Sequence, residues 1–285
     1  MPAPPVSLEE TVAVDVARAL EEDVGAGDLT AALVPAGKRA HARLITRVDA
    51  VLCGTAWFDR TVKSLDVGAS IRWNFRDGNA VSADSTLCEI VGEARGLLTA
   101  ERTALNFVQL LSSVATRTRT FVKLVEGTRA KIVDTRKTIP GLRLAEKYAV
   151  RVGGGTNHRI GLFDGILLKE NHLAAAGGVR PAVEAALRAA RPGTLLQVEV
   201  ETITQLREAI DAGARLILLD NFTPGAMREA VAVAADRAEL EASGGVDERN
   251  VRAIAETGVH RISIGTLTKD VKAIDLSLRF SADTP

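Results

Sequence analysis

The second part of the chain alternates short apolar runs with amphipathic helical patterns, and this rhythm limits the possible folds more than any other feature. From residue 130 onward the runs are KIVDT, YAVRVGG, GILLK, LLQVEV, LILLD, ELEASGG and RISIG. Helical patterns such as RPAVEAALRAAR and TITQLREAIDAG separate several of them. Repeated strand–helix units predict a parallel sheet covered by helices.

We expect seven such strands to form an α/β barrel that is closed or nearly closed. About 140 residues are available for it, whereas an eight-stranded barrel usually takes about 200–250. A doubly wound open sheet is the alternative, and periodicity alone does not choose between the two.

The first part of the chain, to about residue 110, follows a different pattern. An amphipathic stretch over 8–20 predicts a helix. Four alternating runs, ARLITRV, AVLCGTA, SIRWNF and TLCEIVGEA, predict a mostly antiparallel sheet with helices against it. Apolar residues over 98–126 predict a long helix, or two with a break, that leads into the second domain. The chain therefore reads as two α/β domains.

Composition excludes several classes of protein. The 285 residues are 46% apolar and carry 36 basic and 36 acidic side chains, a balance that argues against a nucleic-acid binder. No run approaches the roughly 20 apolar residues of a membrane span. The start lacks the basic and apolar regions of a signal peptide. The two cysteines, Cys53 and Cys88, lie in apolar runs, so we expect no disulfide framework and a cytoplasmic location.

Basic side chains are concentrated between residues 129 and 172. This segment holds nine Lys or Arg and only four Asp or Glu, although the whole chain is neutral. It also contains a Pro-Gly turn and three consecutive glycines. Basic groups beside glycines at strand ends predict a pocket for a small, multiply anionic ligand.

Further candidates lie where the later strands end, which is where a βα barrel carries its functional groups. Glu199 and Asp220 could hold ribose hydroxyls, Mg²⁺ or a developing cation, or could simply form ion pairs with nearby bases. Glu201 alternates with Glu199 and is expected on the same side of its strand. Gly244 and Gly245 after Ser243, and Gly265, would let the backbone approach a phosphate ahead of helix N-termini, or would only shape βα turns.

Two basic candidates allow more than one reading. Lys169 ends the run GILLK and could bind an anion or act as a Schiff-base nucleophile, with a surface lysine as the plain alternative. His158 follows the triple glycine and could be a hydrogen-bonded structural residue instead of a ligand-binding one. We expect Asp134 to lie beside Arg136 and Lys137 and to orient them without contacting the ligand itself.

The chain resembles the quinolinate phosphoribosyltransferase family, whose members are also called carboxylating nicotinate-nucleotide pyrophosphorylases. The match runs nearly end to end, apart from the first twenty residues. The matching stretches are EDVGAGDLT at 22–30, GLLTAERTALNF at 96–107, DTRKTIPGLRLAEKYAVRVGGGTNHRIGL at 134–162, LLKENH at 167–172, EVE at 199–201, ILLDNF at 217–222, EASGGV at 241–246 and ISIGTLT at 262–268.

This resemblance implies a fold and an assembly. An N-terminal α/β sandwich over 1–112, rejoined by 270–285, would pack with a seven-stranded, open α/β barrel over 113–269. It also implies a homodimer in which the sandwich of one copy closes the barrel mouth of the other, so that Arg102 enters the partner's active site.

The resemblance also implies an activity. The chain would transfer phosphoribose from phosphoribosyl pyrophosphate to quinolinate with decarboxylation, giving nicotinate mononucleotide, pyrophosphate and CO₂ in NAD biosynthesis, with Mg²⁺ as cofactor. Lys137, Lys169, Glu199 and Asp220 would be catalytic, and Glu199 and Asp220 would face Mg²⁺, mostly through substrate and water. The residues expected to bind substrate are Arg102, Thr135, Arg136, Lys137, His158, Arg159, Lys169, Glu199, Asp220, Ser243, Gly244, Gly245, Ser263, Ile264 and Gly265.

Three other functions compete with this one. A class I aldolase-like lyase would use Lys169 as a Schiff base, but the abundance of arginine and the single tyrosine, Tyr148, argue against it. A non-catalytic binder of phosphate ligands is a second alternative. A related enzyme acting on another pyridine or heterocyclic acid is the third.

Overall fold

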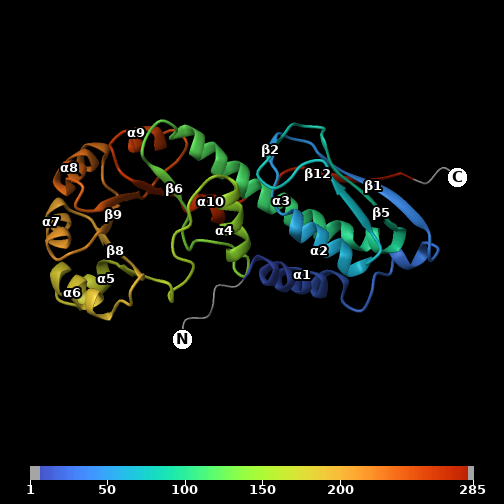
Figure 1. The fold of residues 1–285 in the computed structure, drawn as a ribbon, viewed down its shortest axis with the longest axis horizontal. Coiled ribbons are helices and arrows are strands. Elements are labelled where there is room, and N and C mark those ends of the chain that lie inside the picture. Colours follow the sequence, from blue (N-terminus) through green and yellow to red (C-terminus); the bar gives the residue numbers. More distant parts are fainter. Residues whose placement is uncertain (1–6, 282–285) are drawn as a thin grey trace. The chain divides into compact units, whose positions relative to one another are not determined.

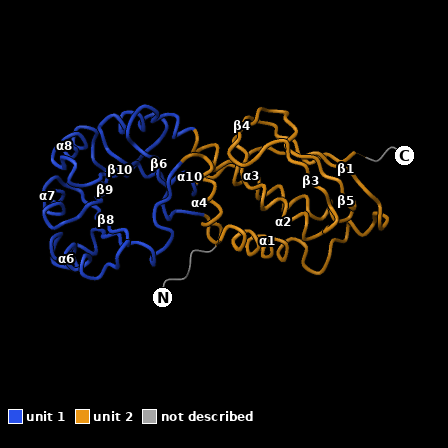
Figure 2. Tube along the Cα trace, in the orientation of Figure 1, with its two compact units in different colours: residues 1–2, 120–138, 155–269 blue, residues 3–119, 139–154, 270–285 orange. Residues whose placement is uncertain are grey.

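The computed structural model describes residues 7–281, which form two compact units (Figure 2). Unit 1 contains residues 120–138 and 155–269, and unit 2 contains the remainder of the described chain. The predicted boundary between residues 112 and 113 lies within a single helix, α3, which continues without a break from Ala94 to Leu124. The alternative of two helices with a break over 98–126 is therefore wrong.

Unit 2 is built on a four-stranded sheet in the order β12-β1-β5-β3, with antiparallel pairing throughout (Figure 1). The strands of unit 2 are β1 (Arg39–Thr46), β2 (Ala50–Val51), β3 (Ser70–Trp73), β4 (Ala80–Val81), β5 (Thr86–Glu93) and β12 (Leu276–Ser281), of which β2 and β4 pair only with each other. Its helices are α1 (Leu8–Val24), the 3₁₀ turn η1 (Ala31–Leu33), α2 (Thr55–Leu65), the first part of α3, and α4 (Arg143–Val152).

The alternation in β1 explains how this sheet packs. Ala40, Ala42 and Leu44 are buried and face a core that includes Phe58 of α2, whereas the residues between them are mainly exposed. A period of two residues places one face of a strand in the core and the other in water. β12 pairs antiparallel with β1, so the last described strand completes the sheet that the N-terminal segment begins.

Unit 1 is a parallel sheet of six strands in the order β6-β11-β10-β9-β8-β7, with helices between successive strands (Figure 1). Its strands are β6 (Lys131–Val133), β7 (Gly165–Leu168), β8 (Leu195–Val200), β9 (Leu216–Asp220), β10 (Glu239–Ser243) and β11 (Arg261–Ser263). Its helices, besides the end of α3, are α5 (Glu170–Ala175), α6 (Val179–Ala189), α7 (Ile203–Asp211), α8 (Pro224–Ala234), α9 (Val251–Ala255) and α10 (Thr266–Lys269).

One predicted strand is wrong. The run YAVRVGG belongs to helix α4, which lies in unit 2. Its buried residues Ala145, Ala149 and Val150 have the spacing of a helix face, and this period outweighed the β-branched valines that suggested a strand. In the described residues an isolated parallel bridge between Val133 and Thr156 stands beside β6 where that strand was expected.

Candidate functional site

Two cavities that share four lining residues open at the carboxyl ends of the unit 1 strands. The first, which we call the cationic cavity, has a volume of about 320 Å³. The second, which we call the glycine cavity, has a volume of about 460 Å³. Both sizes are typical of small-molecule sites. Because Thr135, Lys137, Ser243 and Ser263 line both, one ligand could extend from one cavity into the other.

Each cavity has its own chemical character. The residues lining the cationic cavity are Thr135, Arg136, Lys137, His158, Arg159, Leu167, Lys169, Glu199, Leu218, Glu241, Ser243 and Ser263. The residues lining the glycine cavity are Thr135, Lys137, Asp220, Asn221, Ser243, Gly244, Gly245, Val246, Ser263, Ile264, Gly265, Thr266 and Lys269.

The cationic cavity carries four basic side chains and two carboxylates. Lys169, at the end of β7, is half exposed, and its Nζ lies 3.1 Å from Oε2 of Glu199 at the end of β8. Because its lysine is half exposed, this pair adds little to stability, and the lysine can exchange its partner for a ligand at low cost. A Schiff-base lysine must have its amine free to attack a carbonyl, whereas Nζ of Lys169 is engaged by this carboxylate. This contact argues against the aldolase alternative.

Arg159 is held at the edge of the cavity by its own loop. Its Nη1 donates to the backbone oxygen of Gly165 over 2.9 Å. Burial, together with the nearby Arg136, lowers the pKa of Arg159, and Asp164 opposes that shift. Two guanidinium groups brought together at a partly buried site raise the local positive potential. An anion that reaches this cavity would relieve the repulsion between them.

His158 is fixed in one tautomer by the protein. Its Nδ1 accepts from the backbone N–H of Arg159 over 2.7 Å, so the ring proton must be on Nε2. Nε2 lies 2.5 Å from Oε1 of Gln197, which therefore accepts that proton's hydrogen bond. Oδ1 of the fully buried Asp134 accepts from the backbone N–H of His158 over 2.8 Å. With both ring nitrogens engaged, His158 orients the loop that carries Arg159.

The floor of the cationic cavity is polar and closed to solvent. Glu241 is fully buried, and its Oε2 lies 3.0 Å from Nε of Arg261 on the neighbouring strand β11. Its Oε1 lies 4.0 Å from Nε2 of His158. The amide nitrogen of buried Gln197 has no hydrogen-bond partner among the described residues. Such orphaned polar atoms are costly in an apolar core and mark a polar interior beneath the cavity.

The glycine cavity is shaped mainly by backbone. Asp220 closes β9 with its carboxylate at the cavity, and Ser243 closes β10 beside it in register. A Cβ atom at Gly265 would lie 3.0 Å from Cδ of Lys137, so the absence of a side chain there makes room for the lysine that reaches both cavities. Thr268 of α10 donates through Oγ1 to the backbone oxygen of Lys137 over 2.7 Å.

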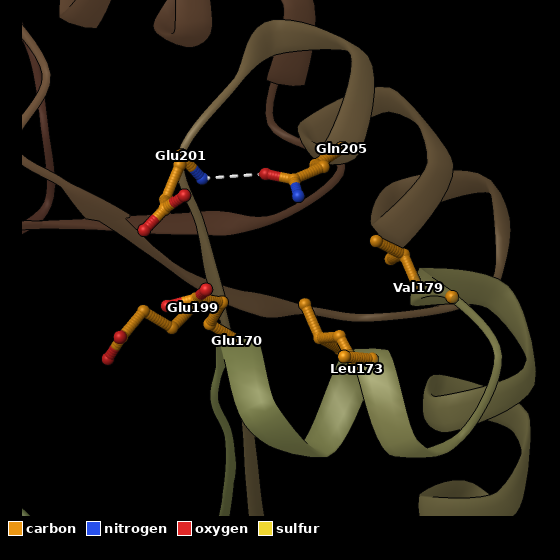
Figure 3. A pocket seen from close by; sticks show the side chains of 8 residues that line it. Glu170, Leu173, Val179, Glu199, Glu201 and Gln205 are labelled. Atoms are coloured by element: carbon orange, nitrogen blue, oxygen red, sulfur yellow. Dashed lines mark hydrogen bonds between the residues drawn. The ribbon is translucent and has the colours of Figure 1, made fainter.

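The predicted site residues divide between these two cavities. All of them except Arg102 line one or both. Arg102 is exposed and lies on α3 in unit 2. Glu201 follows the end of β8, is exposed, and donates its backbone N–H to Oε1 of Gln205 over 2.8 Å (Figure 3). With Glu199 it borders a third cavity of about 250 Å³ under α5 and α7.

Several lining residues were not predicted. Glu241 was missed although it stands two residues before Ser243, a spacing that places both on the same face of β10. By the same two-residue spacing, Gln197, which lines neither cavity, lies on the same face of β8 as Glu199. Asn221 was missed because a residue after a strand has no periodic signal. Lys269 was missed because it lies in the short helix α10, and only the folded structure places that helix beside the cavity.

Residues 7–281 contain neither a self-sufficient metal cluster nor a membrane-spanning helix. No cluster of three or more His, Cys, Asp or Glu in this part of the chain could hold a metal ion by itself. No helix in it is long and apolar enough to cross a membrane. Cys53 and Cys88 are both buried, and neither forms a disulfide.

Family models match almost the whole chain in two adjacent parts. Residues 28–112 match the model described as the quinolinate phosphoribosyl transferase N-terminal domain. Residues 114–279 match the model of the C-terminal domain of the same family.

Individual proteins agree with these models. The chain is 41% identical to a probable carboxylating nicotinate-nucleotide pyrophosphorylase of Bacillus subtilis, over 90% of this chain and 89% of the relative. It is 42% identical to a carboxylating nicotinate-nucleotide pyrophosphorylase of Mycobacterium leprae, over 92% and 95% of the two chains. A solved nicotinate-nucleotide pyrophosphorylase from Francisella tularensis superimposes with a TM-score of 0.93 at 44% identity, covering 96% and 98%. These matches confirm the predicted resemblance and the α/β barrel fold.

Proposed function

This chain belongs to the quinolinate phosphoribosyltransferase family, and from that premise we propose that its two barrel cavities carry out a Mg²⁺-dependent phosphoribosyl transfer to quinolinate. The chain is thus a decarboxylating pentosyltransferase of NAD biosynthesis. The products are nicotinate mononucleotide, pyrophosphate and CO₂. The observation that carries the proposal is the pair of cavities, one cationic and one lined by glycines, joined at Lys137.

The cationic cavity suits the pyridine dicarboxylate. Arg136 and Arg159 offer planar forks that match carboxylates, and Lys169 adds a compact charge. The floor under the pyridine ring is closed to solvent, and its Glu241 carboxylate is paired with Arg261. In this arrangement quinolinate would bind with its ring nitrogen toward the glycine cavity.

The glycine cavity suits the phosphoribose. Backbone N–H groups around Gly244, Gly245 and Gly265 would receive the 5-phosphate, and Asp220 would face the ribose. Lys137 would lie between the pyrophosphate and the pyridine carboxylates. Its place in both cavities makes it the residue on which both substrates depend.

The reaction then follows from charge. The bond from ribose C1 to pyrophosphate breaks with oxocarbenium character, which the carboxylates of Glu199 and Asp220 stabilise. The pyridine nitrogen forms the new bond to C1 and becomes positive. The bond to the 2-carboxylate breaks next, CO₂ leaves, and its electron pair stays at C2, stabilised by that nitrogen until C2 takes a proton. No residue serves as a covalent nucleophile.

The residues fit a Mg²⁺ ion that arrives with phosphoribosyl pyrophosphate. Mg²⁺ is usually held by one or two carboxylates together with substrate phosphates, and Asp220 and Glu199 supply hard oxygen ligands of this kind. When bound, the ion would neutralise charge on the leaving pyrophosphate.

A decarboxylation assay tests the proposed function. The purified chain should release CO₂ from quinolinate only when phosphoribosyl pyrophosphate and Mg²⁺ are both present, and nicotinate in place of quinolinate should give little product. If no CO₂ is released when all three components are present, the proposed function is wrong. Equal turnover of nicotinate would favour the related enzyme that acts on another heterocyclic acid, and binding without turnover would favour a phosphate-ligand binder.

We also propose a homodimer in which Arg102 completes the cationic cavity of the partner subunit. The exposure of Arg102 on α3 supports this role, since no hydrogen bond or ion pair holds its side chain in the described residues. Arg102→Ala and Lys137→Ala should each be strongly impaired, and mixing the two should raise the activity above that of either variant alone, because a heterodimer regains one intact site. Mixtures that stay equally impaired despite subunit exchange would contradict the shared site. The cytoplasmic location stays a prediction.

A further inference from the structure

We propose that Asn221, the residue after Asp220, is a positioning residue for phosphoribosyl transfer, and that residue 244 is glycine because the Asn221 side chain needs its space. The inference rests on the proposed function, since it acts through Asp220. It concerns the turn after β9 and the facing turn after β10, both at the glycine cavity.

The first observation is a hydrogen bond between neighbours. Nδ2 of Asn221 donates to Oδ2 of Asp220 over 3.0 Å. One carboxylate oxygen is thereby occupied, and the other remains for a ribose hydroxyl or a metal-bound water. A carboxylate at a binding site holds its orientation through such outer contacts, and its rotation would otherwise cost part of the binding energy.

The second observation is an unusual backbone. Asn221 has a φ of +55°, in the left-handed region that few residues other than glycine occupy. Asparagine is among those that tolerate it. The N–H of Asn221 donates to the backbone oxygen of Ser243 over 3.1 Å, which ties the end of β9 to the end of β10. This turn therefore aims the side chain across the gap between the two strands.

The third observation is the space at Gly244. A Cβ atom there would lie 2.1 Å from Oδ1 of Asn221, far inside the contact distance of two atoms. Gly245 differs, because a Cβ atom on it would meet nothing within 4 Å. Both glycines have a positive φ, of +98° and +59°. Gly244 is thus required both by backbone and by a neighbouring side chain, and Gly245 by backbone alone.

Together these contacts form a relay from one strand end to the next. Gly244 leaves room for the Asn221 amide, the amide orients Asp220, and Asp220 faces the ribose. The role that the sequence suggested for Gly244, letting a phosphate approach, is then carried mainly by Gly245. This division between two adjacent glycines is what the experiment separates.

The activity test uses Asn221→Gly, which keeps the left-handed turn and removes the amide. We expect kcat/KM for phosphoribosyl pyrophosphate to fall about tenfold, the effect of losing one hydrogen bond to a charged group, while KM for quinolinate changes by less than about twofold. Asn221→Asp keeps the shape but sets a second carboxylate beside Asp220, and should lose more. If KM for quinolinate rises as much as kcat/KM for phosphoribosyl pyrophosphate falls, the positioning role is overturned.

The packing test is a thermal-unfolding cycle that needs no turnover. Gly244→Ala should lower Tm in the wild-type chain and should lower it clearly less in Asn221→Gly, because the collision with the side chain is gone and only the positive φ and a 3.2 Å approach to the backbone nitrogen of residue 221 remain. Gly245→Ala is the matched control and should lower Tm equally in both backgrounds. If the two Gly244→Ala shifts are equal, the proposed contact is overturned. An inactive wild-type chain would instead remove the proposed function and leave this cycle readable.

Discussion

The two cavities of the barrel are adjacent, but different parts of the chain build them. Side chains from six strands or their ends and from one loop form the cationic cavity, whereas turns with positive φ and small residues form most of the glycine cavity. A cavity made of side chains depends on which residues are present, and a cavity made of backbone depends on the space that residues leave. Substitutions should therefore affect the two substrates separately, except where a residue reaches both cavities.

Lys137 is the charged residue among the four that line both cavities, and its substitution should give the largest effect. We expect Lys137→Ala to lower kcat/KM for quinolinate and for phosphoribosyl pyrophosphate by about 10- to 150-fold each, since a contact to a charged group contributes about 1.5–3 kcal/mol and this lysine would make one to each substrate. Steady-state kinetics with each substrate varied in turn would measure this. Lys131→Ala, an exposed lysine that begins β6, is the control. Loss confined to one substrate would show that the cavities do not share Lys137.

Arg159 tests the cationic cavity alone. Arg159→Leu should raise KM for quinolinate by about 100-fold and leave KM for phosphoribosyl pyrophosphate within about threefold, because a bidentate contact to a carboxylate is lost. Arg159→Lys should recover only part of the affinity, since lysine keeps the charge without the fork. An equal rise for both substrates would break the proposed division of the site.

Gly245 is the counterpart in the glycine cavity. Gly245→Ala strains a backbone with φ +59° and narrows the approach to the backbone N–H groups. We expect about a tenfold rise in KM for phosphoribosyl pyrophosphate and no change for quinolinate. Competition by inorganic phosphate, measured against the same substrate, should weaken in parallel. Unchanged phosphate competition would argue that the phosphate binds elsewhere.

Gln197 should give a smaller effect, because it acts through His158. Gln197→Met removes the acceptor for Nε2 and should raise KM for quinolinate by about three- to fivefold, with KM for phosphoribosyl pyrophosphate unchanged. In wild-type protein, ¹⁵N NMR of the imidazole should show the Nε2–H tautomer. If Nδ1 carries the proton instead, the assigned hydrogen bonds around His158 are wrong.

Glu146 lines neither cavity and should change stability without changing turnover. Burial raises its pKa to about 7, against the pull of the Ile139 N–H and Arg143. The carboxyl group of Glu146 therefore holds its proton more tightly in the folded chain than in the unfolded chain. The folded chain loses stability as the pH rises from about 4.5 through about 7. Glu146→Gln should raise Tm by about 2–4 °C at pH 8 and by little at pH 5. Equal shifts at both pH values would contradict the raised pKa.

Much of the fold could be predicted because periodicity reports which face of an element is buried. The alternation in β1 and the apolar runs of β7 to β10 predicted an antiparallel sheet followed by a parallel one. The run at Tyr148 failed because its valines favour a strand while its spacing also fits a helix, and only the surrounding packing decides between them. The length of α3 was uncertain for a similar reason, since a possible break leaves no periodic trace.

The residue types of the site were also readable, but their partners were not. Strand-end positions identified Lys169, Glu199 and Asp220, since parallel strands bring their carboxyl ends to one edge. The contacts that tune them involve residues far apart in the chain. Gln197 meets His158 across 39 positions, and Glu241 meets Arg261 across two strands. Spacing in one sequence carries no information about such pairs.

The sequence by itself therefore determined the kind of chemistry this chain supports, because cations, carboxylates and glycines at strand ends are local features with a known consequence. The tertiary structure alone decided how these groups are divided into two cavities, which tautomer His158 adopts, and why residue 244 has no side chain. The physical reason is that each of these depends on atoms brought within a few ångströms by folding. Local pattern sets which groups are available, and packing sets what each one touches.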